Sequence, residues 1–167
     1  MVKVKSYANI AIVKYWGKKD AKKMIPATSS ISLTLNDMFT ETEMEFISDE
    51  DIKISVEKEM KNGDYKDKFS NMTDLFYLNG ELQDSVHTEK ISKVVDLFRE
   101  NRSQKVKIST TNNMPTAAGL SSSSSGLSAV IKACNELFGK NYTQSELAQI
   151  SKFGSGSSSR SFFGPIA

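Results

Sequence analysis

A run of small and hydroxyl-bearing residues at positions 112–126 has the composition of a phosphate-binding loop: Asn-Asn-Met-Pro-Thr-Ala-Ala-Gly-Leu-Ser-Ser-Ser-Ser-Ser-Gly. It lies between a short strand pattern and a segment whose apolar residues recur at helical spacing, so its serines fall at a helix start. Unpaired backbone N–H groups and the helix dipole favour an anion there. Gly119 lets the backbone approach a phosphate without a Cβ in the way, and Pro115 stiffens the entry. The run contains neither a Walker loop nor a dinucleotide-binding glycine motif.

A flexible serine linker is the alternative interpretation of this run, because such a composition is typical of linkers. The amphipathic helix pattern that follows at once, whose start the serines can cap, argues against a linker. The sequence therefore predicts a phosphate site at the loop.

A second anion site is predicted at residues 154–161, which read Gly-Ser-Gly-Ser-Ser-Ser-Arg-Ser. Two glycines and alternating serines can form a turn whose N–H and hydroxyl groups face an anion. Arg160 can direct two N–H groups at two oxygens of a carboxylate or phosphate. An ordinary surface loop is the alternative for this segment.

A third segment, residues 8–20, combines cations with aromatic residues: Ala-Asn-Ile-Ala-Ile-Val-Lys-Tyr-Trp-Gly-Lys-Lys-Asp. Lys14 and Lys18 are four residues apart, around two aromatics and Gly17. From the residues alone, a strand end with Trp16 in the core and both lysines in water remains an open alternative.

Several other chemistries find no support in the sequence. Cys134 is the only cysteine and His87 the only histidine, which excludes an internal disulfide and a Cys/His zinc set. His87 lies in a polar stretch with no nucleophile-elbow motif, so we expect a solvated surface residue. The net charge of +2, with basic and acidic residues interspersed, does not indicate a nucleic-acid partner. No apolar run has the length of a membrane span or a secretory signal, so we expect no membrane association and a cytoplasmic location.

The secondary structure that must position these segments is predicted to be mostly strands in the first part of the chain and helices in the later part. Apolar patterning predicts strands at 2–5, 10–13, 30–35, 40–46 and 106–110. Residues 47–73 have the weakest pattern, within which Ile52, Ile54 and Val56 indicate a strand. Residues 75–78 followed by Asn79 and Gly80 predict a hairpin.

Helices are predicted where apolar residues recur every three or four positions. One such face spans 91–98, and a second spans 127–138 and ends at Gly139. Thr-Gln-Ser-Glu at 143–146 has the form of a capping box and opens a further helix. This order predicts an α+β fold rather than regular βαβ alternation.

The three segments resemble motifs of a known superfamily. Pro-Thr-Ala-Ala-Gly-Leu-Ser-Ser-Ser at 115–123 resembles the second motif of the GHMP kinases, a loop that wraps a nucleotide triphosphate. Asn-Ile-Ala-Ile-Val-Lys-Tyr-Trp-Gly-Lys at 9–18 and Ser-Gly-Ser-Ser-Ser-Arg-Ser at 155–161 resemble the diphosphomevalonate decarboxylases within that superfamily. Pro-Ala-Thr-Ser-Ser-Ile-Ser at 26–32 is similar to the family segment that follows the first motif. The pair at 9–18 and 155–161 separates the decarboxylases from their kinase relatives.

The resemblance implies a fold and a reaction. The fold is the α+β amino-terminal domain of GHMP kinases (ribosomal protein S5 domain 2-like), here over residues 1–167, with the carboxy-terminal domain outside the chain. The reaction is the ATP- and Mg²⁺-dependent decarboxylation of mevalonate 5-diphosphate to isopentenyl diphosphate through phosphorylation of the 3-hydroxyl. A mevalonate or phosphomevalonate kinase, and a phosphate-binding fragment without turnover, are the alternatives. Family members allow a homodimer, which no residue pattern here indicates, and the metal ligands stay unassigned.

The resemblance also implies roles for individual residues. Lys14 is expected near the transferring groups, as the catalytic residue of this chain. The expected substrate-binding residues are Tyr15, Trp16, Gly17, Lys18, Ser155, Gly156, Ser157, Ser158, Ser159 and Arg160. The expected nucleotide-binding residues are Pro115, Ala118, Gly119, Ser121, Ser122, Ser123 and Ser124.

The chain departs from the family at the general base. The family's base is an aspartate in an Asp-Ala-Gly-Pro-Asn element far downstream, and no such element occurs in these 167 residues. Proton abstraction from a hydroxyl needs a positioned base. We therefore do not expect turnover by these residues alone, and we expect an exposed apolar face where the rest of a family member would pack.

Overall fold

A five-stranded sheet forms the base of the protein. The computed structural model describes residues 1–14, 17–20, 25–62, 68–69, 72–114, 122–152 and 154–166. Across the sheet the order is β1, β4, β7, β5, β6, and every neighbouring pair is antiparallel except β5 and β7. The strands are β1 (Val2–Val13), β4 (Ile31–Phe46), β5 (Leu75–Leu78), β6 (Glu81–Leu82) and β7 (Val106–Asn112). A separate two-stranded sheet pairs β2 (Lys18–Asp20) with β3 (Ile25–Pro26).

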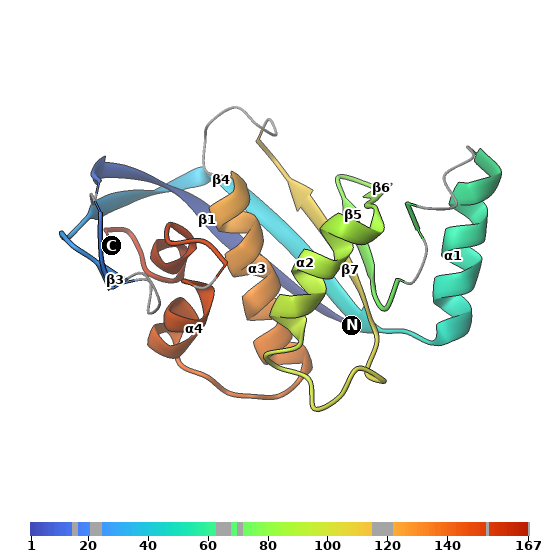
Figure 1. Ribbon diagram of the computed structural model, residues 1–167. Helices are drawn as coiled ribbons and strands as arrows, with labels where there is room; N and C mark the ends of the chain where they lie inside the picture. Colours follow the sequence, from blue (N-terminus) through green and yellow to red (C-terminus); the bar gives the residue numbers. More distant parts are fainter. Residues whose placement is uncertain are drawn as a thin grey trace.

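Helices cover one face of this sheet, and one helix lies apart. α2 (Ser85–Val95), α3 (Ser122–Leu137), α4 (Gln144–Ser151) and the short 3-10 helix η1 (Ser158–Phe162) pack on the same side (Figure 1). α1 (Asp49–Asn62) lies beyond the far end of the sheet. The predicted α+β class is confirmed. Within the described residues, no helix combines the length and apolarity needed to cross a bilayer.

The two long strands join pieces that the sequence patterns predicted separately. β1 contains both 2–5 and 10–13, and β4 contains both 30–35 (from residue 31) and 40–46. The register shifts between Tyr7 and Ala8, whose partners on β4 are Phe39 and Leu35. Such a bulge bends a strand without ending it, which lets β4 continue across its polar residues at 36–37.

The strand predicted from Ile52, Ile54 and Val56 is wrong, because these residues lie in α1. The Asp51 carboxylate accepts hydrogen bonds from the Ser48 N–H (2.8 Å) and hydroxyl (2.6 Å), and the Asp51 N–H donates to the Ser48 hydroxyl oxygen at 3.2 Å. These reciprocal bonds cap the helix start, and acidic residues 49–51 complement its dipole. Local capping therefore overrides a weak alternating pattern. Ile52 is buried, whereas Ile54 is exposed.

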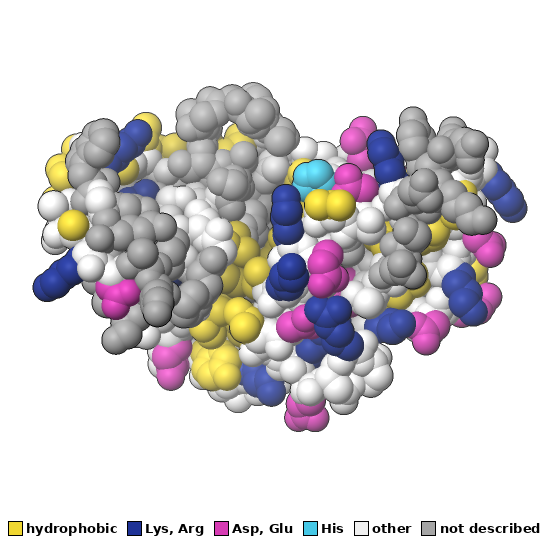
Figure 2. Space-filling model, viewed as in Figure 1, with side chains coloured by type: hydrophobic (Ala, Val, Ile, Leu, Met, Phe, Trp, Pro, Cys, Tyr) yellow, Lys and Arg dark blue, Asp and Glu magenta, His cyan; other side chains and the backbone are white. Residues whose placement is uncertain are grey.

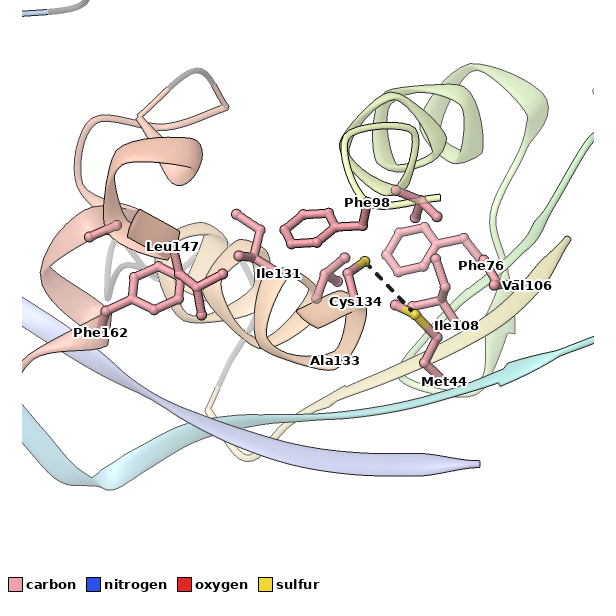
Figure 3. Packing of buried hydrophobic residues seen from close by; sticks show 13 residues of the cluster. Met44, Phe76, Phe98, Val106, Ile108, Ile131, Ala133, Cys134, Leu147 and Phe162 are labelled. Atoms are coloured by element: carbon pink, nitrogen blue, oxygen red, sulfur yellow. Dashed lines mark hydrogen bonds between the residues drawn. The ribbon is translucent and has the colours of Figure 1, made fainter. Parts of the chain in front are cut away.

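The core fills the space between the sheet and α2 and α3. Met44 and Ile108 project from the sheet toward Ile131 and Cys134 of α3, and Phe98, just beyond α2, closes the cluster (Figure 3). The Cys134 thiol contacts the Met44 sulfur at 3.9 Å, and burial raises its pKa well above the ordinary value. Cys134 is thus an inert packing residue.

A buried ion pair ties the β5 side of the sheet to the end of α2. Asp74 is completely buried and accepts hydrogen bonds from both terminal nitrogens of Arg99, at 2.9 and 3.0 Å. It also accepts from the Ser92 hydroxyl (2.6 Å) and the Val106 N–H (3.0 Å). Because every strong acceptor position on the carboxylate is used, this charge is buried only as part of a complete network.

Two predicted turns and one predicted helix cap are confirmed. Asn79 (φ 51°) and Gly80 (φ 87°) turn β5 into β6, and left-handed values at both positions are what a tight hairpin requires. Gly139 (φ 61°) follows the end of α3. Thr143 and Glu146 form both halves of the capping box of α4.

Replacing Thr143 with alanine should destabilise the protein by about 1 kcal/mol at neutral pH, because the cap is lost. Glu146 accepts from the Thr143 N–H and hydroxyl, both at 2.8 Å, and these bonds hold its pKa below the ordinary value. A carboxyl with a lowered pKa stabilises the fold above its unfolded pKa, about 4.3, and loses that contribution as pH falls. Urea unfolding at pH 7 and pH 3 checks this: the deficit of the Thr143→Ala variant should be smaller at pH 3. Ser145→Ala, an exposed change in the same turn, is the control; an equal deficit there would contradict the capping role.

Candidate functional site

Arg160 is the centre of the candidate site because two distant segments hold its guanidinium. Its Nε donates to the side-chain oxygen of Asn9 on β1 at 3.1 Å, and its Nη1 donates to the Ser30 hydroxyl at 3.1 Å. Neither acceptor is charged. Among the described residues, no carboxylate lies within ion-pair distance of Arg160. A fixed, uncompensated guanidinium is suited to receive an anion.

Asn9 holds the Arg160 guanidinium in its orientation. It was not among the predicted site residues. It is 1% exposed, and its amide nitrogen donates to the Ser161 hydroxyl at 2.7 Å and to the Ser157 carbonyl at 3.4 Å. These bonds direct the amide oxygen at Arg160. The sequence feature that could have indicated Asn9 as a site residue is its amide side chain within the otherwise apolar stretch 8–13. Ser30, also missed, had no signal beyond its place in the segment 26–32.

The serine turn before Arg160 is held together largely by its own hydroxyls. Ser155 and Ser157 hydroxyls lie 3.0 Å apart, and the Ser159 hydroxyl donates to the Gly156 carbonyl at 3.1 Å. Ser158 is fully buried, with its hydroxyl 2.6 Å from the Ser155 carbonyl and 3.1 Å from that of Ser151. Ser158 therefore shapes the turn from inside, while Ser155, Gly156, Ser157 and Ser159 are half-buried.

The first motif lies beside the segment that reaches Arg160. Lys14 is exposed just after β1, and Gly17 has φ 69°, a left-handed conformation that suits glycine. The Ala27 N–H donates to the Gly17 carbonyl at 3.2 Å, and β2 pairs with β3. The 26–30 segment thus touches the first motif at Gly17 and Arg160 at Ser30. Tyr15, Trp16 and the side chain of Lys18 lie outside the described residues.

α3 begins at Ser122, where the sequence predicted the helix start. The predicted residues Pro115, Ala118, Gly119 and Ser121, and the side chains of Ser122 and Ser123, lie outside the described part of the chain. The first turn of α3 contains no acidic residue, so nothing in that turn opposes an anion at the helix start.

Two serines of α3 contact the sheet through their hydroxyl groups. Ser124 and Ser125 are fully buried, and the Ser125 hydroxyl lies 2.8 Å from that of Thr40 on β4. Ser128, one turn later, places its hydroxyl 2.6 Å from that of Ser6 on β1. The serine run therefore has a structural use that composition did not reveal: small hydroxyl side chains let the helix approach the sheet closely.

The Arg160 turn and α3 lie against each other on the same face of the sheet (Figure 1). Ser6 of β1 joins them, since its hydroxyl contacts both the Ser128 hydroxyl (2.6 Å) and the Ser161 carbonyl (3.4 Å). The start of α3, whose first turn has no acidic residue, and the Arg160 guanidinium are both chemically suited to anions. Within the described residues no cluster of His, Cys, Asp or Glu could hold a metal ion.

His87 lies in the first turn of α2, and an apolar groove beside that helix extends to Gly154 at the start of the 154–161 segment. The His87 ring is 2.8 Å from the Asp84 carboxylate in the first turn of α2, and its side chain is 58% exposed. An apolar groove of about 470 Å³ separates α2 from α3 and α4. Hydrophobic side chains gather over α3, with basic side chains of α2 beside them (Figure 2).

Comparison with known proteins gives one consistent family. Residues 6–167 match the diphosphomevalonate decarboxylase-like N-terminal domain. A diphosphomevalonate decarboxylase of Schizosaccharomyces pombe is 31% identical over 175 aligned residues, which cover 96% of this chain and 40% of that protein. The chain thus spans about two fifths of the length of this curated relative.

Solved structures show the same fold. Mevalonate pyrophosphate decarboxylase from Streptococcus pyogenes is 53% identical, with a TM-score of 0.79, and the match covers 99% of this chain and 46% of that one. The mevalonate diphosphate decarboxylase of Enterococcus faecalis, described with a mevalonate diphosphate-mediated ATP binding mechanism, is 36% identical, with a TM-score of 0.75 and coverage of 98% and 45%. The protein designated MDDEF, in complex with MVAPP, AMPPCP and magnesium, is 36% identical, with a TM-score of 0.74 and coverage of 98% and 44%.

Proposed function

This chain belongs to the family of diphosphomevalonate decarboxylase-like N-terminal domains, and we propose that the full-length protein containing it is an ATP-dependent mevalonate 5-diphosphate decarboxylase. In the proposed reaction the tertiary 3-hydroxyl is phosphorylated, and phosphate and carbon dioxide then leave to give isopentenyl diphosphate. The observation that carries the proposal is the Arg160 guanidinium, held by Asn9 of the first motif and Ser30 of the 26–32 segment without a carboxylate partner among the described residues.

The substrate is proposed to lie against the Arg160 turn and the first motif. Its diphosphate and carboxylate are anions, so Arg160 and the N–H and hydroxyl groups of 155–159 would bind and orient them. Tyr15, Trp16, Gly17 and Lys18 are proposed to contact the diphosphate. The exposed Lys14 is proposed to place its ammonium near the transferring phosphate, where negative charge concentrates.

The nucleotide phosphates are proposed to lie at the start of α3, against Pro115, Ala118, Gly119 and residues 121–124. The helix start fits this role because its first turn has no acidic side chain. Ser124, being fully buried, would contribute through the helix backbone rather than through its hydroxyl. When bound, ATP supplies the phosphoryl group, and Mg²⁺ offsets repulsion between the two polyanions.

Turnover is proposed to need more than residues 1–167. The 3-hydroxyl proton requires a base, and the family's aspartate element does not occur in this sequence. An exposed apolar patch at the ends of β1 and β4, made by Ile10, Ile12, Ile31 and Leu33, is proposed to be covered by further chain of the full-length protein. By this proposal, residues 1–167 form a binding domain that is inactive alone.

The test is an assay of the purified full-length protein for ATP-dependent release of carbon dioxide. Mevalonate 5-diphosphate should release carbon dioxide and ADP in equal amounts, whereas mevalonate and mevalonate 5-phosphate should release neither. ADP formation from mevalonate or its monophosphate, without carbon dioxide, would support a kinase instead. Under the same conditions, residues 1–167 alone should bind ligand but release no carbon dioxide.

A further inference from the structure

Lys132, in the middle of α3, is a half-buried cation that the proposed reaction does not use directly. Its ammonium donates to the Ser6 hydroxyl and to the Ser161 carbonyl, both at 3.3 Å, and lies 5.4 Å from the centre of the Phe162 ring. Among the described residues no carboxylate lies within 4.0 Å of it. Glu136, one turn along the same helix, does not pair with it.

The fold does not need Lys132 to satisfy the groups that it contacts. The Ser6 hydroxyl already bonds to the Ser128 hydroxyl at 2.6 Å, and the Ser161 carbonyl also accepts from Ser6 at 3.4 Å. Without the ammonium, the single Ser6 hydroxyl proton can still serve the Ser161 carbonyl if the Ser128 hydroxyl donates to Ser6 in place of the Ser125 carbonyl. Burial lowers the pKa of Lys132, which means that folding disfavours its charged form. A lysine with a lowered folded pKa destabilises the fold at pH values below that pKa, and the cost is relieved as pH rises through it.

The Lys132 ammonium lies close to the turn that contains Arg160. Ser161 directly follows Arg160, and its hydroxyl accepts from Asn9, whose oxygen receives the Arg160 Nε. Lys132 thus lies immediately behind the turn that presents Arg160. A positive charge in a partly desolvated position acts over a longer range than one in water, and its effect grows with the charge of the ligand.

We propose that Lys132 is a positioning residue for a polyanionic substrate: it holds an uncompensated positive charge behind the Arg160 turn and strengthens binding of a diphosphate at the cost of stability. The inference rests on the proposed function, because it takes the Arg160 turn as the diphosphate and carboxylate site. It adds to that function a residue that no ligand touches.

The test uses two neutral replacements in the full-length protein, Lys132→Met and Lys132→Gln. In both, KM for mevalonate 5-diphosphate should rise about tenfold, as loss of one partly desolvated charge near a multiply charged ligand predicts, while kcat stays within about threefold. The melting temperature should stay equal or rise by a few degrees. Lys93→Met, an exposed change on α2 with the same loss of net charge, should leave KM unchanged.

Two results would overturn the inference. KM within about twofold of the wild-type value in both variants would show that the charge does not serve the ligand. A fall of several degrees in melting temperature in both variants would make Lys132 a structural support instead. Failure of the wild-type protein to use mevalonate 5-diphosphate would overturn the proposed function and this inference together, whereas an active wild type with unchanged variants would overturn the inference alone.

Discussion

Replacing Arg160 with alanine should lower kcat/KM of the full-length protein for mevalonate 5-diphosphate about ten- to a hundredfold, since each hydrogen bond to a charged group contributes about 1.5–3 kcal/mol. The guanidinium is held at 3.1 Å from both Asn9 and Ser30, so it meets a ligand in a prepared orientation. Alanine removes both the charge and that geometry. Steady-state kinetics at saturating ATP measures the effect.

Matched variants separate the site effect from a general loss of charge. Arg102 is exposed and pairs with Asp96 and Glu89, so Arg102→Ala should leave kcat/KM within about twofold. Asn9→Ala keeps the guanidinium but removes one of its two fixed contacts, and should give a loss between those of the other two variants. Near-normal turnover by the Arg160→Ala protein, with a normal melting temperature, would contradict the site assignment.

Replacing Asp74 with asparagine should destabilise the protein by about 1.5–3 kcal/mol, the cost of losing hydrogen bonds to a buried charged group, while Arg99 keeps its ion pair with Asp96. Arg99, whose side chain is 1% exposed, would lose two hydrogen bonds from its terminal nitrogens, and Ser92 and Val106 would lose a charged acceptor. A loss of this size is a large share of the stability of an ordinary domain. Urea or thermal unfolding of the full-length protein measures it.

The control for Asp74→Asn is a substitution in an ion pair at the protein surface. Glu41 is one-third exposed and pairs with Lys3 and Lys5 at 3.8 and 3.7 Å, so Glu41→Gln should cost less than about 1 kcal/mol. Replacing Asp74 and Arg99 together with leucine should recover part of the loss, because no unpaired charge stays buried. An Asp74→Asn deficit no greater than that of Glu41→Gln would contradict the account of the network.

Features fixed by neighbouring residues could be predicted from the sequence. The hairpin at Asn79 and Gly80, the end of α3 before Gly139 and the capping box at Thr143 depend on residues within a few positions of one another. α1 is also encoded locally: the alternating residues 52–56 favour a strand, whereas Ser48 and Asp51, three positions apart, form the reciprocal bonds that start a helix. Local signals can compete, and here capping outweighed alternation.

Contacts between distant segments could not be predicted in the same way. Asn9 and Arg160 are 151 residues apart, and only the antiparallel pairing of β1 with β4 and the packing of η1 on β1 bring them together. The sequence also does not show which serines contact the sheet, because adjacent hydroxyl groups have the same chemistry. Burial of Ser125 and Ser128 against the sheet follows from the rotation of α3, which no local pattern specifies.

The central claim is that the Arg160 turn and the start of α3 gather two polyanionic molecules on one side of the sheet. Calorimetry of the full-length protein with mevalonate 5-diphosphate and with unphosphorylated mevalonate tests it most directly. The account predicts that the diphosphate binds at least about a hundredfold more tightly, the equivalent of one or two charged hydrogen bonds. Equal affinity for the two compounds would contradict it.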